Sequence, residues 1–135
     1  MPRVEKYMQK DFIRVPDTTQ VSQALKMMFE SGENYVVVVR GGGVQIAGIV
    51  TRTDVISLRG SIVLKEGYVR DIVGDQTLIA VMPQDFMQDA RSKFERYANI
   101  DQLIVLELLT PVGILTKHDV IRWMYEEEFA NLPPD

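Results

Sequence analysis

The sequence predicts an α/β (α+β) fold of two pseudo-symmetric repeats, each in the order β-α-β-β-α and packed as one compact module. A seven-residue phrase occurs twice, as Gly-Ile-Val-Thr-Arg-Thr-Asp at 48–54 and as Gly-Ile-Leu-Thr-Lys-His-Asp at 113–119. Three further blocks match around it in the same order, at offsets of 65 to 67 residues. Each copy also combines β-branched runs with helical apolar spacing. The chain is therefore predicted to be a duplicated mixed unit.

The matching blocks define the expected boundaries. Segment 4–8 matches 69–73, and an apolar segment that ends in proline, 12–16, matches 78–83. We expect a first repeat at 1–64 with an N-terminal helix, a second repeat at 65–128, and a C-terminal tail at 129–135. A chain of about 60 residues buries too little surface to be more than marginally stable alone. We therefore expect the two copies to share one core.

The first repeat is predicted to open with a strand and a helix. Ile13–Val15 is a short strand that Pro16 ends, because proline cannot donate to a β-ladder. A helix at about 20–31 follows, and either Thr18 or Thr19 is expected to cap it.

The rest of the first repeat is predicted as a hairpin and a closing helix. The runs 35–40 and 44–50 are rich in β-branched residues, and Gly41-Gly42-Gly43 joins them as a turn. A helix at 53–60 closes this repeat. The glycines lack the Lys-Ser/Thr pair of a phosphate-binding loop and open no helix, so a turn is the favoured interpretation.

The second repeat follows the same order. A helix is expected at about 86–98, followed by strands near 102–108 and 112–115 and a closing helix at 117–128. The turn between these strands is unusually apolar and lacks the glycines of the first copy. We therefore expect the two copies to form unequal sites.

Composition excludes several classes of function. The chain is 46% apolar and 25% charged with net charge −4, and it has no cysteine. These values are typical of a soluble globular protein and exclude disulfides, thiolate chemistry and cysteine-based zinc sites. No signal peptide or membrane-spanning run is evident, so we expect a cytoplasmic protein without membrane contact. The acidity argues against nucleic-acid binding, with one alternative: a local basic face of Arg52, Arg59, Lys65, Arg70 and Lys117.

The repeated phrase has a purely structural interpretation. Thr-x-x-Asp between a strand and a helix is a capping box, in which the threonine oxygen and the carboxylate satisfy amides at the start of the helix. Thr51 with Asp54, and Thr116 with Asp119, fit these roles without any ligand.

The same residues also fit a nucleotide site. A helix N-terminus attracts phosphate, and a carboxylate one turn along can accept bonds from ribose hydroxyls. Arg52, Lys117 and His118 lie inside the phrase, where cations neutralise phosphate oxygens. His118 is the only histidine, so one chain cannot form a site that needs two imidazoles, and we expect no metal and no catalytic group.

These motifs resemble those of tandem CBS domains, the pair also called a Bateman module. Both copies match the family pattern Gly-apolar-x-(Thr/Ser)-x-x-(Asp/Asn) after a β-hairpin, and the resemblance covers residues 4 to 126. The resemblance implies a non-catalytic sensor that binds AMP, ADP, ATP or another adenosine derivative, with S-adenosylmethionine and NAD left open. It also implies a homodimer that regulates a partner protein whose identity the sequence does not give.

The resemblance assigns roles to residues. It implies ribose or phosphate contacts for Thr51, Arg52, Asp54, Thr116, Lys117, His118 and Asp119. It implies adenine contacts for Ile13, Val15, Tyr35, Ile79 and Val81. The alternative to this sensor is a ligand-free interaction or dimerisation module, in which the Thr-x-x-Asp motifs only cap helices.

Overall fold

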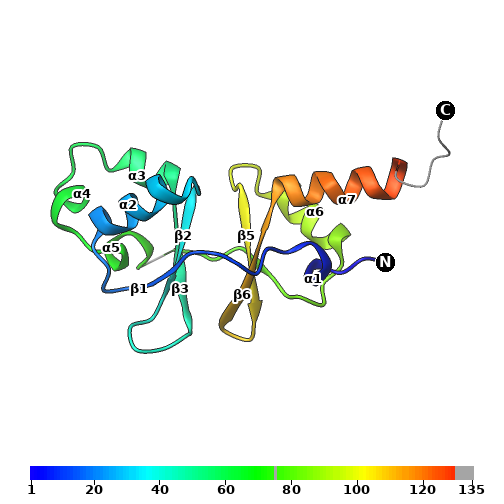
Figure 1. Cartoon of the computed structure of the whole chain (residues 1–135), viewed down its shortest axis with the longest axis horizontal. Coiled ribbons are helices and arrows are strands. Elements are labelled where there is room, and N and C mark those ends of the chain that lie inside the picture. The colour runs from blue at the N-terminus through cyan, green and yellow to red at the C-terminus, as the bar shows by residue number, and fades with distance from the viewer. Residues whose placement is uncertain (75, 130–135) are drawn as a thin grey trace. The chain divides into compact units, whose positions relative to one another are not determined.

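The computed structural model describes residues 1–74 and 76–129, which form two compact units (Figure 1). We call Phe12–Leu78 the Asp54 unit, after the motif aspartate that it contains. The Asp119 unit combines Met1–Asp11 with Ile79–Asp135. Each unit contains one three-stranded sheet together with helices, which confirms the predicted mixed fold class.

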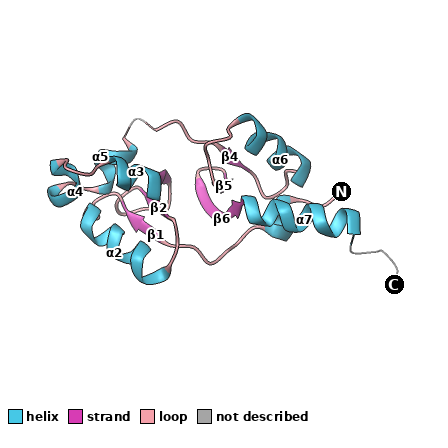
Figure 2. Cartoon of the chain, turned by 90° about the horizontal axis from the view of Figure 1, so that it is seen from above, coloured by secondary structure: helices cyan, strands magenta, loops and turns pink. Residues whose placement is uncertain are grey.

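The Asp54 unit packs its helices on one side of its sheet (Figures 1 and 2). In the sheet order β1-β2-β3, β1 is parallel to β2 and β2 is antiparallel to β3. All five residues of the central strand β2 are buried. The elements are β1 Arg14–Pro16, α2 Val21–Ser31, β2 Tyr35–Val39, β3 Ile46–Thr51, α3 Arg52–Ser57, α4 Ile62–Glu66 and α5 Val69–Val73.

The start of α2 differs from the expectation. Neither Thr18 nor Thr19 caps it, because the N-cap is Gln20, whose side chain makes no capping bond. The first helical amide, that of Val21, instead donates to the carbonyl of Gly67 at 3.0 Å. A backbone partner from a distant segment therefore replaces the predicted side-chain cap.

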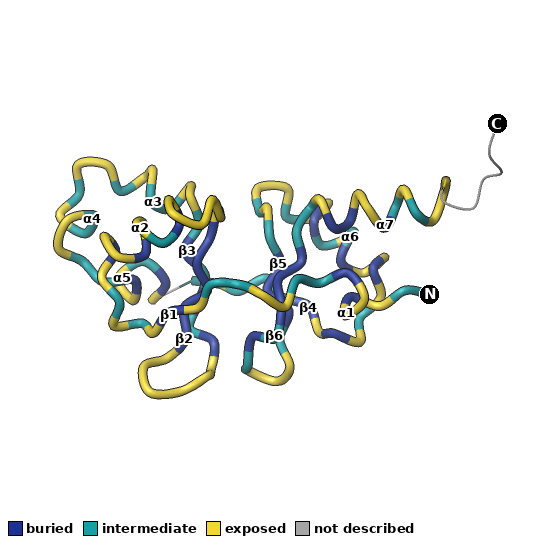
Figure 3. The backbone as a smooth tube through the Cα atoms, in the orientation of Figure 1, coloured by how far each residue is buried: buried dark blue, intermediate teal, exposed yellow. Residues whose placement is uncertain are grey.

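The end of the Asp54 unit also differs. The predicted helix 53–60 is the shorter α3, and a second helix, α4, follows it without having been predicted. Gly60 has φ +82° between them, a left-handed conformation that cannot continue α3. The predicted turn at 41–43 lies between β2 and β3, which confirms the hairpin, and it is exposed (Figure 3).

The Asp119 unit repeats this architecture with a longer final helix. In the order β4-β5-β6, β4 is parallel to β5 and β5 is antiparallel to β6. Of the expected tail 129–135, Phe129 ends α7 and the remainder lies outside the described residues. The elements are α1 Val4–Tyr7, β4 Ala80–Val81, α6 Met87–Arg96, β5 Gln102–Glu107, β6 Thr110–Thr116 and α7 Lys117–Phe129.

The short helix that opens each sequence repeat packs in the unit of the other repeat. The amide of Val4, in α1, donates to the carbonyl of Asp85 at 2.8 Å, so α1 belongs to the Asp119 unit. Reciprocally, the amide of Val69, in α5, donates to the carbonyl of Thr19 at 2.8 Å. The compact units therefore cut across the sequence repeats, and the repeat boundaries at 64 and 128 stay a prediction.

Each unit has its own cluster of buried apolar side chains. Figure 3 shows that buried residues lie along the strands of both units. The cluster of the Asp54 unit is rich in valine from its strands and from α5. That of the Asp119 unit has larger members, among them Phe94, Leu103 and Trp123. Within the described ranges, no helix combines the length and the apolar character that crossing a membrane requires.

Candidate functional site

The motif of the Asp54 unit forms a complete capping box where β3 meets α3. Asp54 Oδ2 accepts from the Thr51 amide and from the Thr51 hydroxyl, both at 2.9 Å. The Asp54 amide donates back to the Thr51 hydroxyl oxygen at 3.4 Å. Both side chains are half-buried. The predicted capping geometry is therefore confirmed.

The motif of the Asp119 unit forms the same box in a more enclosed place. Asp119 Oδ2 accepts from the Thr116 amide at 2.8 Å and from the Thr116 hydroxyl at 2.9 Å. It also accepts from Gln9 Nε2 at 3.3 Å, a contact without a counterpart at Asp54 among the described residues. Asp119 is only 6% exposed and is the one buried charged side chain in the described part of the chain. The two motif carboxylates therefore differ in accessibility.

The motif glycines pack against the protein's own chain. A Cβ added at Gly48 would lie 2.7 Å from Val73 Cβ and 2.6 Å from Gln76 Oε1. A Cβ added at Gly113 would lie 2.7 Å from Met8 Sδ. In both units the absence of a side chain at the glycine thus lets the end of the exchanged short helix, or the residues just after it, approach the strand closely.

Two glutamines that the sequence reasoning missed contact the motif strands. Gln76 bonds the backbone of Ile49 through its side chain, with Ile49 N to Oε1 and Nε2 to Ile49 O both at 2.9 Å. Gln9 bonds the backbone of Ile114 through its own backbone, at 2.8 and 2.9 Å. Gln9 and Gln76 are 67 residues apart, the same offset as Pro16 and Pro83. That repeated offset was the available signal.

The motif cations have different surroundings. Arg52 is exposed in the first turn of α3, and His118 is exposed in the first turn of α7. Lys117 Nζ donates to the Ala98 carbonyl at 3.1 Å and lies 3.7 Å from Asp101 Oδ1. Lys117 is therefore already held by its own unit, and phosphate contacts by any of the three stay a prediction.

The residues assigned to adenine are mostly interior to their own units. Val15 and Tyr35 are buried in the Asp54 unit, and Val81 is buried in the Asp119 unit. Val15 and Val81 belong to the core clusters, and Ile13 and Ile79 are partly buried against them. Adenine contacts by these five residues stay a prediction.

The predicted basic face is divided between the units. Arg52, Arg59, Lys65 and Arg70 belong to the Asp54 unit, whereas Lys117 belongs to the Asp119 unit. The guanidinium of Arg70 lies 4.7 Å from the ring centre of Tyr68.

No group of three or more metal-ligating side chains occurs among residues 1–74 and 76–129.

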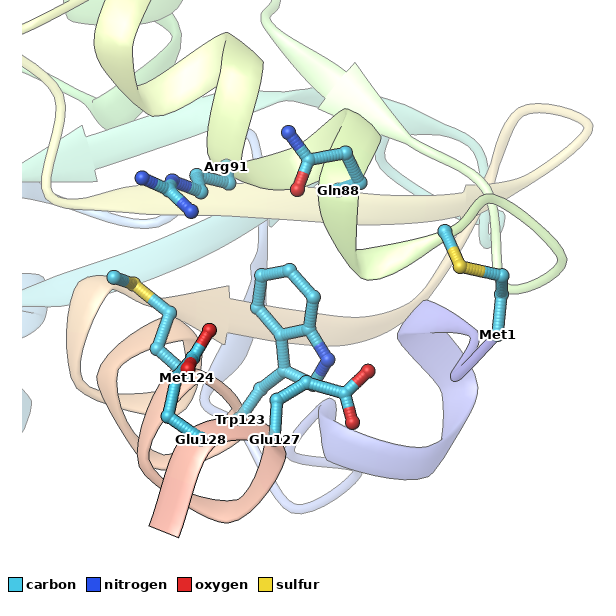
Figure 4. A pocket seen from close by; sticks show the side chains of 7 residues that line it. All are labelled: Met1, Gln88, Arg91, Trp123, Met124, Glu127 and Glu128. Atoms are coloured by element: carbon cyan, nitrogen blue, oxygen red, sulfur yellow. The ribbon is translucent and has the colours of Figure 1, made fainter.

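A separate hollow of about 240 Å³ lies between the N-terminus, α6 and α7 (Figure 4). No motif residue lines it; the lining residues are Met1, Gln88, Arg91, Trp123, Met124, Glu127 and Glu128. The indole Nε1 of Trp123 is buried and has no hydrogen-bond partner among the described residues. The hollow is lined by the carboxylates of Glu127 and Glu128 and by the guanidinium of Arg91, which already pairs with Glu95. The excess of negative charge opposes the binding of a phosphate here.

One ionisable group has a perturbed pKa in the same unit. Burial, followed by the hydrogen bond to Glu126 Oε2 at 2.5 Å, raises the pKa of Tyr7 to about 12. This bond joins α1 to α7, so it holds the exchanged N-terminal segment in the Asp119 unit.

Comparison with solved structures supports the fold. The chain is similar to CBSX2 in complex with AMP, at 20% identity and TM-score 0.82, covering 95% of this chain and 99% of that one. It is similar to the CBS domain pair of protein MJ0100 in complex with 5′-methylthioadenosine and S-adenosyl-L-methionine, at 19% identity, TM-score 0.79 and coverages of 95% and 99%. It is also similar to a CBS-domain containing protein from Agrobacterium tumefaciens, at 17% identity, TM-score 0.75 and coverages of 89% and 91%.

Comparison with curated proteins gave no sequence match. A model of the CBS domain, by contrast, matches the chain twice, at residues 4–61 and 69–126. These two matches contain both Thr-x-x-Asp capping boxes and both exchanged short helices. The chain therefore belongs to the CBS-domain family.

Proposed function

We propose that this protein is a regulatory module that binds an adenine nucleotide or another adenosine derivative through its Thr-x-x-Asp motifs. The observation that carries the proposal is the recurrence of one geometry in both units: a threonine and an aspartate bonded to each other at the end of a third strand. In the proposed complex the aspartates contact ribose, and the threonines and neighbouring cations contact phosphate.

The comparisons support the ligand class. Two proteins of similar fold were solved with AMP or with 5′-methylthioadenosine and S-adenosyl-L-methionine, and these molecules share an adenine base joined to a ribose ring with two hydroxyls. Within this chain, Asp54 is half-buried, and Arg52 is exposed beside it in the first turn of α3. The choice among AMP, ADP, ATP, S-adenosylmethionine and NAD is left to the experiment below.

The proposal includes an output without catalysis. We propose that ligand binding shifts the packing of the two sequence repeats, 1–64 and 65–128, and thereby regulates a partner protein in the cytoplasm. We further propose a homodimer that acts as an energy sensor. Exposed apolar side chains on two helices support protein contacts: Phe29 is 86% exposed on α2, and Tyr125 is 61% exposed on α7.

A second candidate is an interaction module without a ligand. The complete capping boxes favour it, because they give every motif threonine and aspartate a structural role. Under this alternative, replacing Asp54 or Asp119 lowers stability and changes nothing else.

A thermal-melt panel separates the two candidates. The protein is melted alone and with AMP, ADP, ATP, S-adenosylmethionine or NAD, with GTP as the matched non-adenine control. A ligand at 100 times its dissociation constant adds about 2.7 kcal/mol, which raises the melting temperature by several degrees. We expect an adenine compound to do so, and Asp54→Ala or Asp119→Ala to remove the shift. No shift with any compound, together with lower baseline melts of the variants, would favour the interaction module.

A further inference from the structure

Within the described part of the chain, the outer strands β3 and β6 each have one edge without a neighbouring strand in their own sheets. In β3, the amides of Ile49 and Thr51 donate to side chains, at 2.9 Å to Gln76 Oε1 and at 2.9 Å to Asp54 Oδ2. The capping box and Gln76 therefore occupy successive positions along one strand edge. A ligand bonded to Asp54 would therefore meet the backbone of β3 along this edge.

The two units cover this edge by different means. In the Asp119 unit a two-way backbone bridge covers it, with Gln9 N to Ile114 O at 2.8 Å and Ile114 N to Gln9 O at 2.9 Å. In the Asp54 unit the carboxamide of Gln76 makes the equivalent two bonds with Ile49. A side chain can rotate away while its backbone stays in place, whereas a backbone bridge opens only if the whole segment moves.

The Gln76 carboxamide presents a planar acceptor beside a donor. An adenine base presents the same combination, because a ring nitrogen accepts and the adjacent amino group donates. Ile49 lies two residues before Thr51, about 6.6 Å along the strand at the usual rise per residue. A nucleoside bridges such a distance between its base and its ribose hydroxyls.

We propose that Gln76 occupies the position of the adenine base on the Ile49 backbone and must leave when an adenosine ligand binds the Asp54 unit. This inference rests on the proposed function and adds a residue that sets affinity and selectivity at one of the two motifs. Binding then exchanges two bonds of Gln76 for two bonds of the base, so the free protein holds its own competitor. Among the described residues of the Asp119 unit, the equivalent bonds are made by the backbone of Gln9, so no side chain there is exchangeable in this way.

The test is a titration with AMP followed by the backbone amide signals in ¹H–¹⁵N spectra of wild type, Gln76→Ala and Gln9→Ala. The signals of Ile49 and Thr51 report the Asp54 unit, and those of Ile114 and Thr116 report the Asp119 unit. Removing the competitor should tighten binding at the Asp54 unit on the order of tenfold. Gln9→Ala is the matched control, since its backbone bridge survives, and affinity at the Asp54 unit should not change.

Hydrogen exchange of the free variants provides a readout without ligand. Gln76→Ala should speed exchange of the Ile49 amide and leave that of Ile114 unchanged. An unchanged Ile49 rate, or unchanged or weaker AMP binding in Gln76→Ala while wild type binds, overturns this inference and leaves the proposed function standing. If neither wild type nor Gln76→Ala binds AMP, ADP, ATP, S-adenosylmethionine or NAD, both proposals fail.

Discussion

Removing the two motif carboxylates should have unequal effects on stability. Asp54→Ala and Asp119→Ala are the same chemical change at equivalent positions of two equivalent capping boxes. The surroundings differ, because Asp54 is half-buried whereas Asp119 is 6% exposed and also accepts from Gln9. We therefore expect Asp119→Ala to be the more destabilising substitution.

The magnitudes follow from the donors that each substitution leaves without a partner. Losing an ordinary cap costs about 1 kcal/mol, and this value suits Asp54→Ala because Asp54 itself is only half-buried. Asp119→Ala removes the acceptor of two donors of Thr116 and one of Gln9, both half-buried residues, at a position that is itself buried. An unsatisfied buried donor costs about 1–3 kcal/mol. The Thr116 hydroxyl and the Gln9 carboxamide can turn toward other acceptors, so the three costs do not add in full. We therefore expect Asp119→Ala to lower the free energy of unfolding by about 3 kcal/mol in total.

Urea unfolding with two probes measures this difference. The chain has one tryptophan, Trp123, which lies in the Asp119 unit, so its fluorescence follows that unit. Far-ultraviolet circular dichroism follows both units. Asp119→Asn is the matched control, because its remaining oxygen still accepts one bond and should recover part of the loss. If Asp54→Ala costs as much as Asp119→Ala or more, the argument from burial and donor count is refuted.

Gly48→Ala should lower the free energy of unfolding in urea by about 1–3 kcal/mol, because the added Cβ would lie 2.7 Å from a β-carbon of α5. Gly113→Ala should cost less, because its added Cβ first meets the flexible side chain of Met8. A larger loss in Gly113→Ala would contradict this reasoning. Burial and the Glu126 bond raise the pKa of Tyr7 to about 12. The contribution of Tyr7 to the free energy of unfolding should therefore be complete below pH 10 and be lost as the pH rises toward 12. Alkaline unfolding should show a smaller fall in stability for Tyr7→Phe than for wild type. Leu108→Gly should raise the urea midpoint slightly, because Leu108 is 91% exposed at φ +57°; a lower midpoint would contradict it.

Local patterns made much of the fold predictable. The order of strands and helices and the glycine turn at 41–43 depend on residues close together in the chain. The duplication was visible because these local patterns recur at offsets of 65 to 67 residues. The capping boxes were predictable for the same reason, since Thr51 and Asp54 are three residues apart and bond within one helical turn.

The features that sequence reasoning missed depend on distant contacts. Gly67 replaces the expected threonine cap of α2 across 46 residues, from Val21. The exchange of α1 and α5 between repeats leaves no periodic signal in the sequence. A short helix has the same apolar pattern whether it packs against its own repeat or against the other one. The contact of Gln9 with Asp119 spans 110 residues and cannot be inferred from the motif.

Capping and ligand binding are compatible at the same aspartate. Every hydrogen bond that the described residues make to the carboxylates of Asp54 and Asp119 ends on Oδ2. A carboxylate has about four acceptor positions on two oxygens, so Oδ1 remains to accept from a ribose. The cap fixes the orientation of that oxygen, and a group oriented before binding loses less entropy when the ligand arrives. The capping box therefore serves as the support of the proposed site, and Asp54→Ala should lower stability and affinity together.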